Sequence, residues 1–168
     1  MNLNKTTNYI SSCIDKKPKI GLILGSGLDF FTSFIENKII IPYSEIPSFY
    51  QTNVQGHKGE FVYGYIQSIP ILCAKGRFHY YEGYSFDEVG SIIKIFNSLN
   101  TKLSIITNSS GCVDIKWDIG SLMLSNKIID FSFIESSKHI THNFIENKYT
   151  ELAKQIALKN NIKLYEGA

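Results

Sequence analysis

The sequence predicts an α/β fold with a mixed central β-sheet flanked by helices. Short apolar runs typical of buried strands alternate with longer segments that have apolar residues at helical spacing. Neither an internal repeat nor a low-complexity linker interrupts this alternation, and 168 residues fit one domain. We therefore expect a single domain over residues 1–168, in which 43% hydrophobic residues can form a core.

The first predicted unit is a strand, a glycine turn and a helix. An apolar run over residues 20–24 stops at a Gly-Ser-Gly turn over residues 25–27. The residues that follow, 28–35, have an apolar pattern that suits a helix. Residues 41–59 contain two prolines and two glycines, which is typical of an irregular connection. Loops of this length inside a compact domain usually have a function, so we expect a functional loop here.

A hairpin and a helix are predicted next. Two β-rich runs, over residues 60–66 and 69–76, are separated by only two residues, and this spacing predicts a β-hairpin. Residues 85–99 begin with a serine followed three residues later by a glutamate, the pattern of a helix capping box. Apolar residues at helical spacing continue from there, so we expect one helix over this range.

The second half of the chain repeats the alternation. A strand with the composition of a buried strand over residues 102–111 ends in a polar turn, and residues 120–132 contain one or two further strands. Residues 144–161 have the pattern of an amphipathic helix. The residues before the first strand form a polar leader.

Charge and cysteine content argue against several classes of protein. A formal net charge of +2 with scattered lysines speaks against a nucleic-acid partner. Cys13, Cys73 and Cys112 follow no metal-binding spacing, so we expect neither disulfides nor zinc, and a reduced, cytoplasmic setting. No apolar run approaches the roughly 18 residues that span a bilayer, so no membrane partner is expected. His139 and His142, without a third ligand, are a poor argument for a metal.

The Gly-Ser-Gly turn is the first candidate binding element. A glycine turn that opens a helix presents unpaired backbone N–H groups to an anion, and the Ser26 hydroxyl can add a donor. The turn does not extend to a dinucleotide-binding pattern, because Phe30 stands where a third glycine would be. The alternative is a tight strand-to-helix turn without a ligand.

The segment KGRFHYYEGY, residues 75–84, is the densest candidate. Arg77 and His79 are two residues apart after a strand, so both side chains can face the same way if the segment stays extended. Arginine offers a planar fork for phosphate oxygens, and a nearby histidine can donate or transfer a proton. Glu82 is placed to orient one of them. The alternative is an exposed Arg–Glu pair with a solvated histidine.

Three further candidates surround this segment. The tyrosines at 80, 81 and 84 can hydrogen-bond a sugar or cover the edge of the core. Asn108 and Ser109 follow a predicted strand, and ligands of open α/β sheets bind at the carboxyl ends of strands. A plain turn is the alternative for this pair. His57, isolated between glycines of the long loop, is by itself more typical of a surface residue.

Five motifs carry a likeness that extends over most of the chain. In order, they are GLILGSGL, EIPSF, GHKGEFVYGYI, KGRFHYYEGY and TNSSG. Together they resemble the amino-terminal half of the trimeric purine nucleoside phosphorylase family, over about residues 18–130 and weakly again in the final YEGA. The resemblance implies a phosphorylase-like α/β fold, truncated because the family's carboxyl-terminal portion has no counterpart here.

The resemblance also implies roles for individual residues. The implied phosphate-binding residues are Ser26, His57, Arg77, His79 and Ser109. The implied contacts to the sugar or nucleoside are Tyr81, Asn108 and Ser109. The implied catalytic residues are His79 and Glu82.

The implied reaction is phosphorolysis of a purine nucleoside by a pentosyltransferase. Inorganic phosphate, the co-substrate, attacks the anomeric carbon while the purine leaves, and no metal or organic cofactor is expected. The resemblance further implies a homo-oligomer, a trimer. In the family, the residues that recognise the base lie in the carboxyl-terminal portion. We therefore keep as an alternative a catalytically inactive homologue that only binds anions or associates with another chain.

Overall fold

The computed structural model describes residues 1–50, 59–130, 140–143 and 148–168. They form two compact units, Met1–Ser110 and Gly111–Ala168, and each is described by itself. The single domain over residues 1–168 stays a prediction. The first unit contains most of the candidate residues. Its elements, in chain order, are α1 (Leu3–Cys13), β1 (Ile20–Leu24), η1 (Asp29–Phe34), β2 (Glu36–Pro42), η2 (Tyr43–Glu45), β3 (Glu60–Ile66), β4 (Ile69–Lys75), η3 (Tyr80–Glu82), α2 (Phe86–Val89), α3 (Ser91–Ser98) and β5 (Leu103–Ile106).

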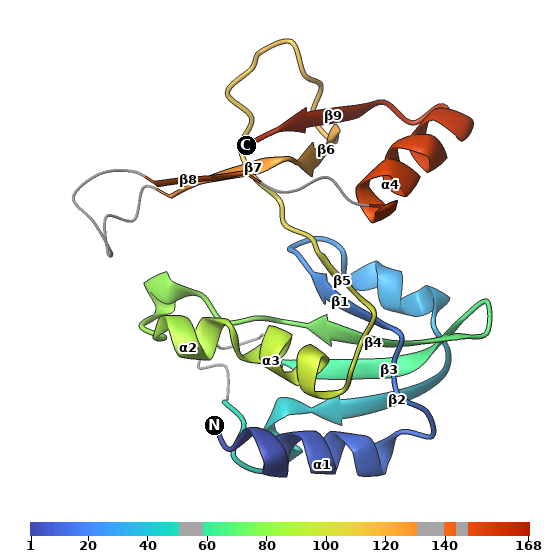
Figure 1. The fold of residues 1–168 in the computed structure, drawn as a ribbon, viewed down its shortest axis with the longest axis vertical. Coiled ribbons are helices and arrows are strands. Elements are labelled where there is room, and N and C mark those ends of the chain that lie inside the picture. Colours follow the sequence, from blue (N-terminus) through green and yellow to red (C-terminus); the bar gives the residue numbers. More distant parts are fainter. Residues whose placement is uncertain (51–58, 131–139, 144–147) are drawn as a thin grey trace. The chain divides into compact units, whose positions relative to one another are not determined.

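The first unit is built on a mixed five-stranded sheet, as the sequence predicted (Figure 1). The strand order is β2-β3-β4-β1-β5. β1 runs parallel to both β4 and β5, whereas β2, β3 and β4 pair in antiparallel fashion. The predicted hairpin is β3–β4, and its two turn residues, Gln67 and Ser68, both have positive φ, as a type I′ turn requires.

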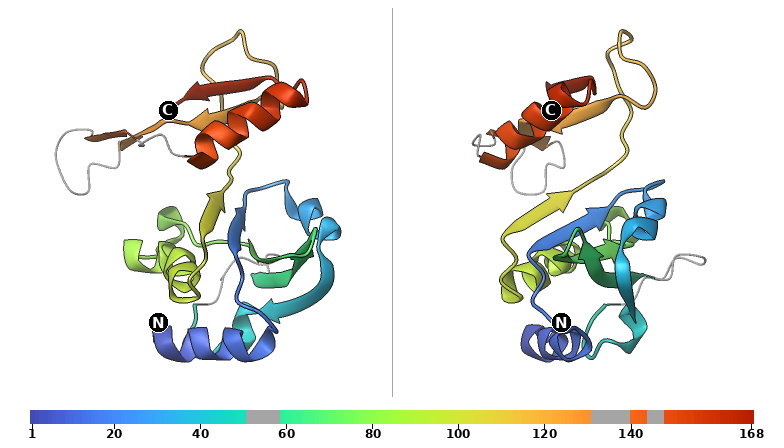
Figure 2. Two further views of the ribbon diagram at one scale, coloured as in Figure 1. Left: turned by 45° about the vertical axis from the view of Figure 1, so that its right-hand side comes forward. Right: turned by 90° about the vertical axis from the view of Figure 1, so that its right-hand side faces the viewer.

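The two faces of this sheet carry separate apolar cores. Alternate residues of β3 and β4, among them Tyr63 and Leu72, belong to the first core, which α1 and α3 cover through Ile10 and Phe96. The residues between them, such as Cys73, point to the other face, where a phenylalanine of η1 packs. Both views in Figure 2 show α3 and η1 on opposite sides of the sheet. The sheet is therefore held from both sides, and its strand ends are fixed in place.

The polar leader contains a helix that the sequence did not predict. α1 begins after Asn2, whose side chain accepts a hydrogen bond from the Lys5 N–H. Its buried positions are Thr6, Thr7 and Ile10. Because two of these three side chains are polar, the sequence shows no apolar stripe, and the helix depends on packing against the first core.

Three other expectations needed correction. Residues 28–35 form the 3₁₀ helix η1 and not an α-helix. β2 follows directly, where no strand was predicted; its last residue, Pro42, is tolerated because β2 is an edge strand. The single helix predicted over residues 85–99 is divided at Gly90 into α2 and α3, although the predicted capping box is present.

The second unit contains the strands and the helix predicted for the second half of the chain. Its elements are β6 (Leu122–Ser125), β7 (Lys127–Asp130), β8 (Ile140–Asn143), α4 (Lys148–Lys159) and β9 (Leu164–Gly167). β6 pairs with β9 in parallel, and β7 pairs with β8 in antiparallel fashion. Trp117 stacks on Tyr165 of β9 with ring centroids 4.0 Å apart. Across both units, no helix of the described residues is long and apolar enough to span a membrane.

A carboxylate joins the linker after α1 to the end of β3. The Tyr63 hydroxyl donates to Asp15 Oδ1 at 2.6 Å, and the Tyr65 hydroxyl donates to Asp15 Oδ2 at 2.5 Å. These hydrogen bonds, first that of Tyr63 and then that of Tyr65, lower the pKa of Asp15 below its ordinary value of 3.8. The ionised form of Asp15 is thus the form that the folded chain favours.

We expect Asp15→Asn to lower the midpoint of urea unfolding at pH 7. A carboxyl whose pKa is depressed on folding contributes stability above its unfolded pKa, and that contribution is lost as the pH falls through the folded pKa. The difference between wild type and Asp15→Asn should therefore be present at pH 5–7 and shrink below pH 4. Urea titrations across this range measure it. Glu36→Gln, at another exposed carboxylate of the same unit, is the control, and equal midpoints for Asp15→Asn and wild type at pH 7 contradict the prediction.

Candidate functional site

The candidate residues gather at one edge of the sheet because three strands run parallel. β1, β4 and β5 all end at this edge, which we call the carboxyl edge. The segments that leave it are residues 25–27 after β1, 76–79 after β4 and 107–109 after β5. Parallel strands of open α/β sheets commonly present their ligand-binding loops at this edge.

The segments after β1 and β5 approach each other closely. The Gly25 N–H donates to Thr107 Oγ1 at 2.9 Å, and Thr107 Oγ1 in turn donates to the Ile23 carbonyl at 2.9 Å. A Cβ on Gly25 would lie 2.6 Å from the Asn108 Cα, which no real side chain tolerates. Glycine is therefore required here to let the β5 segment approach the Gly-Ser-Gly turn.

Arg77 joins the β4 segment to this pair. It is the only arginine of the chain. Its Nη1 donates to the Thr107 carbonyl at 2.8 Å, and its Nε donates to His79 Nε2 at 3.0 Å. The guanidinium is therefore fixed between a backbone oxygen of one segment and a ring nitrogen of another.

The contact with Arg77 determines which nitrogen of His79 carries the proton. Arginine N–H groups can only donate, so His79 Nε2 accepts and its hydrogen must be on Nδ1. His79 Nδ1 lies 2.5 Å from Glu82 Oε1, so the ring donates to this carboxylate. Arg77, His79 and Glu82 thus form one continuous hydrogen-bonded chain, which we call the Arg77–His79–Glu82 relay.

Arg77 and His79 share a face because the residue between them faces the other way. Phe78 is 1% exposed and belongs to the first core. Alternation along an extended segment therefore turns Arg77 and His79 together toward the outside of that core. The sequence-based expectation that these two side chains point the same way is confirmed by their direct hydrogen bond.

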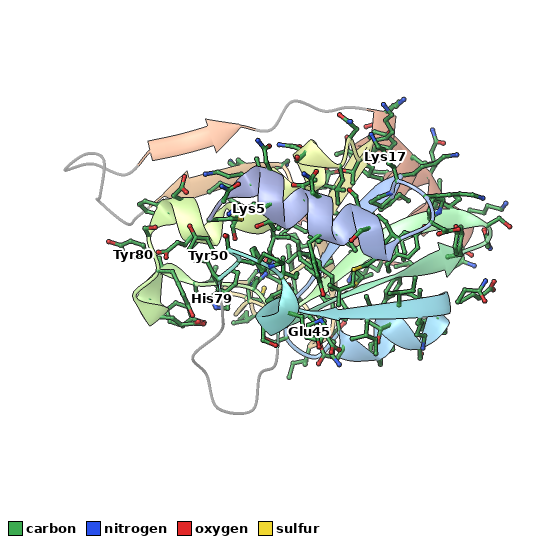
Figure 3. The ribbon with its side chains drawn as sticks, turned by 90° about the horizontal axis from the view of Figure 1, so that it is seen from below. Lys5, Lys17, Glu45, Tyr50, His79 and Tyr80 are labelled. Carbon is green, nitrogen blue, oxygen red and sulfur yellow. The ribbon has the colours of Figure 1, made fainter. Side chains whose placement is uncertain are left out.

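The tyrosines after His79 differ in their surroundings. The Tyr81 ring stacks on the His79 ring with centroids 4.8 Å apart, and 82% of Tyr81 is exposed. Tyr80 stacks on Phe86, the first residue of α2. Figure 3 shows His79 and Tyr50 at the same end of the first unit, whereas Lys17 lies beyond the opposite end of α1. Tyr81 is the tyrosine with most of its surface left to meet a ligand.

The remaining predicted residues are less tightly connected. Ser26 and Ser109 are exposed in their turns, and within residues 1–50 and 59–110 no hydrogen bond joins either hydroxyl to Arg77. Asn108 is exposed, and its backbone packs against Gly25. His57 lies outside the described residues. Among the residues that are described, no three His, Cys, Asp or Glu side chains gather as metal ligands would.

Sequence reasoning missed Thr107, which is central to this geometry. Its hydroxyl bonds the β1 segment and its carbonyl bonds Arg77. The signal available in the sequence was its position as the first polar residue after an apolar strand. That position places it at the carboxyl edge, but its partners come from distant segments and are not visible in the sequence.

Comparisons with known proteins place this chain in a family. The family model described as "Phosphorylase superfamily" matches residues 19–168. Purine nucleoside phosphorylase 1 of Geobacillus stearothermophilus is 40% identical over 73% of this chain and 44% of its own length. The purine nucleoside phosphorylase of Rattus norvegicus is 34% identical over 71% of this chain and 42% of its own length. The chain thus spans about half the length of the curated relatives it matches.

Solved structures give the same result. A purine nucleoside phosphorylase in complex with ribose-1-phosphate matches 99% of this chain and 67% of its own, with a TM-score of 0.81 and 26% identity. The Schistosoma mansoni enzyme in complex with inosine matches 99% of this chain and 64% of its own, with a TM-score of 0.79 and 27% identity. The chain belongs to the phosphorylase superfamily, and the members to which it is similar are purine nucleoside phosphorylases.

Proposed function

We propose that this chain works as a purine nucleoside phosphorylase, a pentosyltransferase. In this reaction, inorganic phosphate attacks the anomeric carbon of a purine ribonucleoside or deoxyribonucleoside. The C–N bond to the purine breaks, and the products are the free base and ribose or deoxyribose 1-phosphate. The observation that carries the proposal is the Arg77–His79–Glu82 relay at the carboxyl edge. Relatives named as purine nucleoside phosphorylases support it.

Arg77 supplies the charge for phosphate. A guanidinium has five N–H bonds; among the described residues, two of them donate to Thr107 and His79, which leaves three for an oxyanion. The two existing contacts fix the plane of the group, which reduces the entropy lost when a ligand binds. The Ser26 hydroxyl, the Ser109 segment and His57 are the further phosphate ligands of this proposal.

His79 and Glu82 handle the proton. Glu82 holds the hydrogen on Nδ1, so the ring keeps a constant orientation. A second proton on Nε2 would turn the ring into a donor toward phosphate in place of an acceptor from Arg77, and Glu82 would balance its positive charge. Nε2 is thus either an acceptor from Arg77, as in this structure, or a donor to phosphate, and the His79 ring has no further acceptor for a ligand.

The sugar would bind next to the phosphate. Tyr81 offers an exposed ring and hydroxyl directly against His79, and Asn108 stands in the segment that packs on Gly25. A sugar held there would develop positive charge at its anomeric carbon as the base leaves. A phosphate fixed by Arg77 would stabilise that charge and be aligned for attack, without a covalent enzyme intermediate.

We also propose a cytoplasmic location and a homo-oligomeric state. The three cysteines, Cys13, Cys73 and Cys112, are free thiols, which suits the reducing cytoplasm. A homo-oligomer, specifically a trimer, follows from the family that the motifs resemble. A second candidate function is anion binding, or association with another chain, without turnover; the Arg77 guanidinium, held by Thr107 and His79, supplies the charge that anion binding needs.

We expect Arg77→Ala to abolish most of the activity. The chain mixed with inosine or guanosine and phosphate should release free base, measured by chromatography, and release should require phosphate. Removing a positioned charge that stabilises the transition state costs about 2–4 kcal/mol, or roughly 30- to 1,000-fold in rate. Lys102→Ala removes one positive charge at the opposite end of β5 and should leave the rate unchanged.

The two candidate functions give different results in this assay. Phosphate-dependent release of base supports the phosphorylase. Binding of phosphate, measured by calorimetry and lost in Arg77→Ala, without release of base leaves anion binding as the function. A chain that neither binds phosphate nor releases base rejects both candidates.

We expect Gly25→Ala to weaken phosphate binding while the chain still folds. The added methyl group would meet the Asn108 Cα at 2.6 Å and the Thr107 carbonyl oxygen at 2.8 Å, so the β5 segment must move away from the turn. Overpacking of this kind costs about 1–3 kcal/mol. Because the same segment holds Arg77, the affinity for phosphate should fall together with stability, as calorimetry and thermal melts can measure. Gly111→Ala, where the methyl group meets open space, should change neither.

A further inference from the structure

The segment that carries the relay packs against a group of aromatic rings. None of these rings belongs to a residue that was predicted to bind a ligand. Phe78, between Arg77 and His79, packs against three aromatic rings that precede β3. The centroid distances are 6.0 Å to Tyr43, 5.6 Å to Phe49 and 5.9 Å to Tyr50. Residues 43–50 therefore form the surface against which the buried side of the relay segment packs.

Tyr43 differs from its neighbours because it also holds two backbone groups. Its hydroxyl donates to the Gly76 carbonyl at 2.9 Å, and its own N–H donates to the Gly59 carbonyl at 3.0 Å. Gly76 directly follows β4, and Gly59 directly precedes β3. One residue, only 2% exposed, thus ties together the two chain segments that meet at this end of the hairpin, one through its hydroxyl and the other through its backbone N–H.

Gly59 and Gly76 have no side chains of their own to fix their contact, so this contact depends on Tyr43. Gly76 has φ of +96°, and a Cβ there would lie 3.2 Å from the Gly59 Cα, so the two backbones touch without side chains between them. The Tyr43 ring fills the space over Gly59, where a Cβ would lie 2.3 Å from Tyr43 Cδ2. Glycine backbones rotate freely unless something holds them.

The hydroxyl acts on Arg77 through one peptide plane. The Gly76 carbonyl and the Arg77 N–H belong to the same planar peptide group, so fixing the carbonyl fixes the direction in which the Arg77 backbone continues. Burial raises the pKa of Tyr43 well above its ordinary value, so the hydroxyl stays protonated and remains a donor. The hydrogen bond to the Gly76 carbonyl is therefore available at neutral pH.

We infer that Tyr43 is a positioning residue for Arg77 in the Arg77–His79–Glu82 relay. It contacts no ligand in this inference; its hydroxyl holds the Gly76–Arg77 peptide so that the guanidinium reaches both Thr107 and His79. The inference rests on the proposed function for its effect on phosphate. Its effect on the order of Arg77 does not depend on that function.

The amino-terminal helix supports the same segment. Thr6 Oγ1 of α1 donates to the Pro47 carbonyl at 3.0 Å, and the amino-terminal ammonium of Met1 donates to the Tyr50 hydroxyl at 2.9 Å. α1 lies before residue 19, where the family-model match begins. α1, which lies outside that match, thus helps to hold residues 43–50, against which the Arg77 segment packs.

The experiment compares Tyr43→Phe with Tyr63→Phe. Tyr63 is the matched control because it is equally buried in the same core, and its hydroxyl donates to Asp15, away from Gly76. Since Arg77 is the only arginine, modification by phenylglyoxal, a reagent for arginine side chains, reports on Arg77 alone by mass spectrometry. The rate is measured with and without inorganic phosphate, at a temperature well below each variant's melting point.

We expect Tyr43→Phe to be modified faster than wild type without phosphate, because its guanidinium is released from Thr107 and His79. Protection should need about three- to tenfold more phosphate, the range that corresponds to one hydrogen bond. Tyr63→Phe should lose stability by a similar amount, yet match wild type in both measurements. Gly59→Ala displaces the Tyr43 ring by an independent route and should reproduce the faster modification, which keeps the test valid if Tyr43→Phe does not fold.

The outcomes separate this inference from the proposed function. Equal modification rates and equal protection in wild type, Tyr43→Phe and Gly59→Ala overturn the inference and leave the phosphorylase proposal standing. Faster modification of Tyr63→Phe as well would also overturn it, because the effect would then be one of stability. A wild type that phosphate does not protect rejects the phosphate site itself, and the rate without phosphate still decides the role of Tyr43.

Discussion

The guanidinium of Arg77 is the constraint on which the carboxyl edge depends. It bonds the Thr107 carbonyl of the segment after β5 and the His79 ring of its own segment, so one side chain links two parallel strands that are not neighbours in the sheet. An arginine can do this because its N–H groups point in fixed directions in one plane. A lysine would supply the charge but could not hold both partners in one geometry.

The close contacts behind Arg77 are made by residues without side chains or by rings. Gly25 lets the β5 segment touch the turn after β1, and Gly76 lies against Gly59 beneath Tyr43. These contacts bring backbone groups to within hydrogen-bond distance of one another. The polar side chains of the candidate site therefore project from a backbone that is already held in place.

Much of the architecture followed from local pattern. The β3–β4 hairpin, β1, β5 and the strands β6 and β7 have clear apolar runs, and all of them lie within their predicted ranges. β5 was expected to be a buried strand, but it is an edge strand of the described sheet and three of its four residues are exposed. α1 was missed because its buried face is mostly threonine, and β2 was missed because an edge strand that ends in a proline carries little signal. In both elements, packing on a core formed by distant residues outweighs local preference.

The candidate site, like the fold, was predictable from the sequence only in part. The sequence by itself determined that Arg77 and His79 share a face, because alternation along an extended segment is a local property, and its motifs pointed to the phosphorylase family. Only the tertiary structure decided that Thr107 receives Arg77, that His79 carries its proton on Nδ1, and that Tyr43 holds Gly76. The contacts of Thr107 with Arg77 and of Tyr43 with Gly76 join residues about 30 positions apart, and such separations close only when the strands are assembled into a sheet.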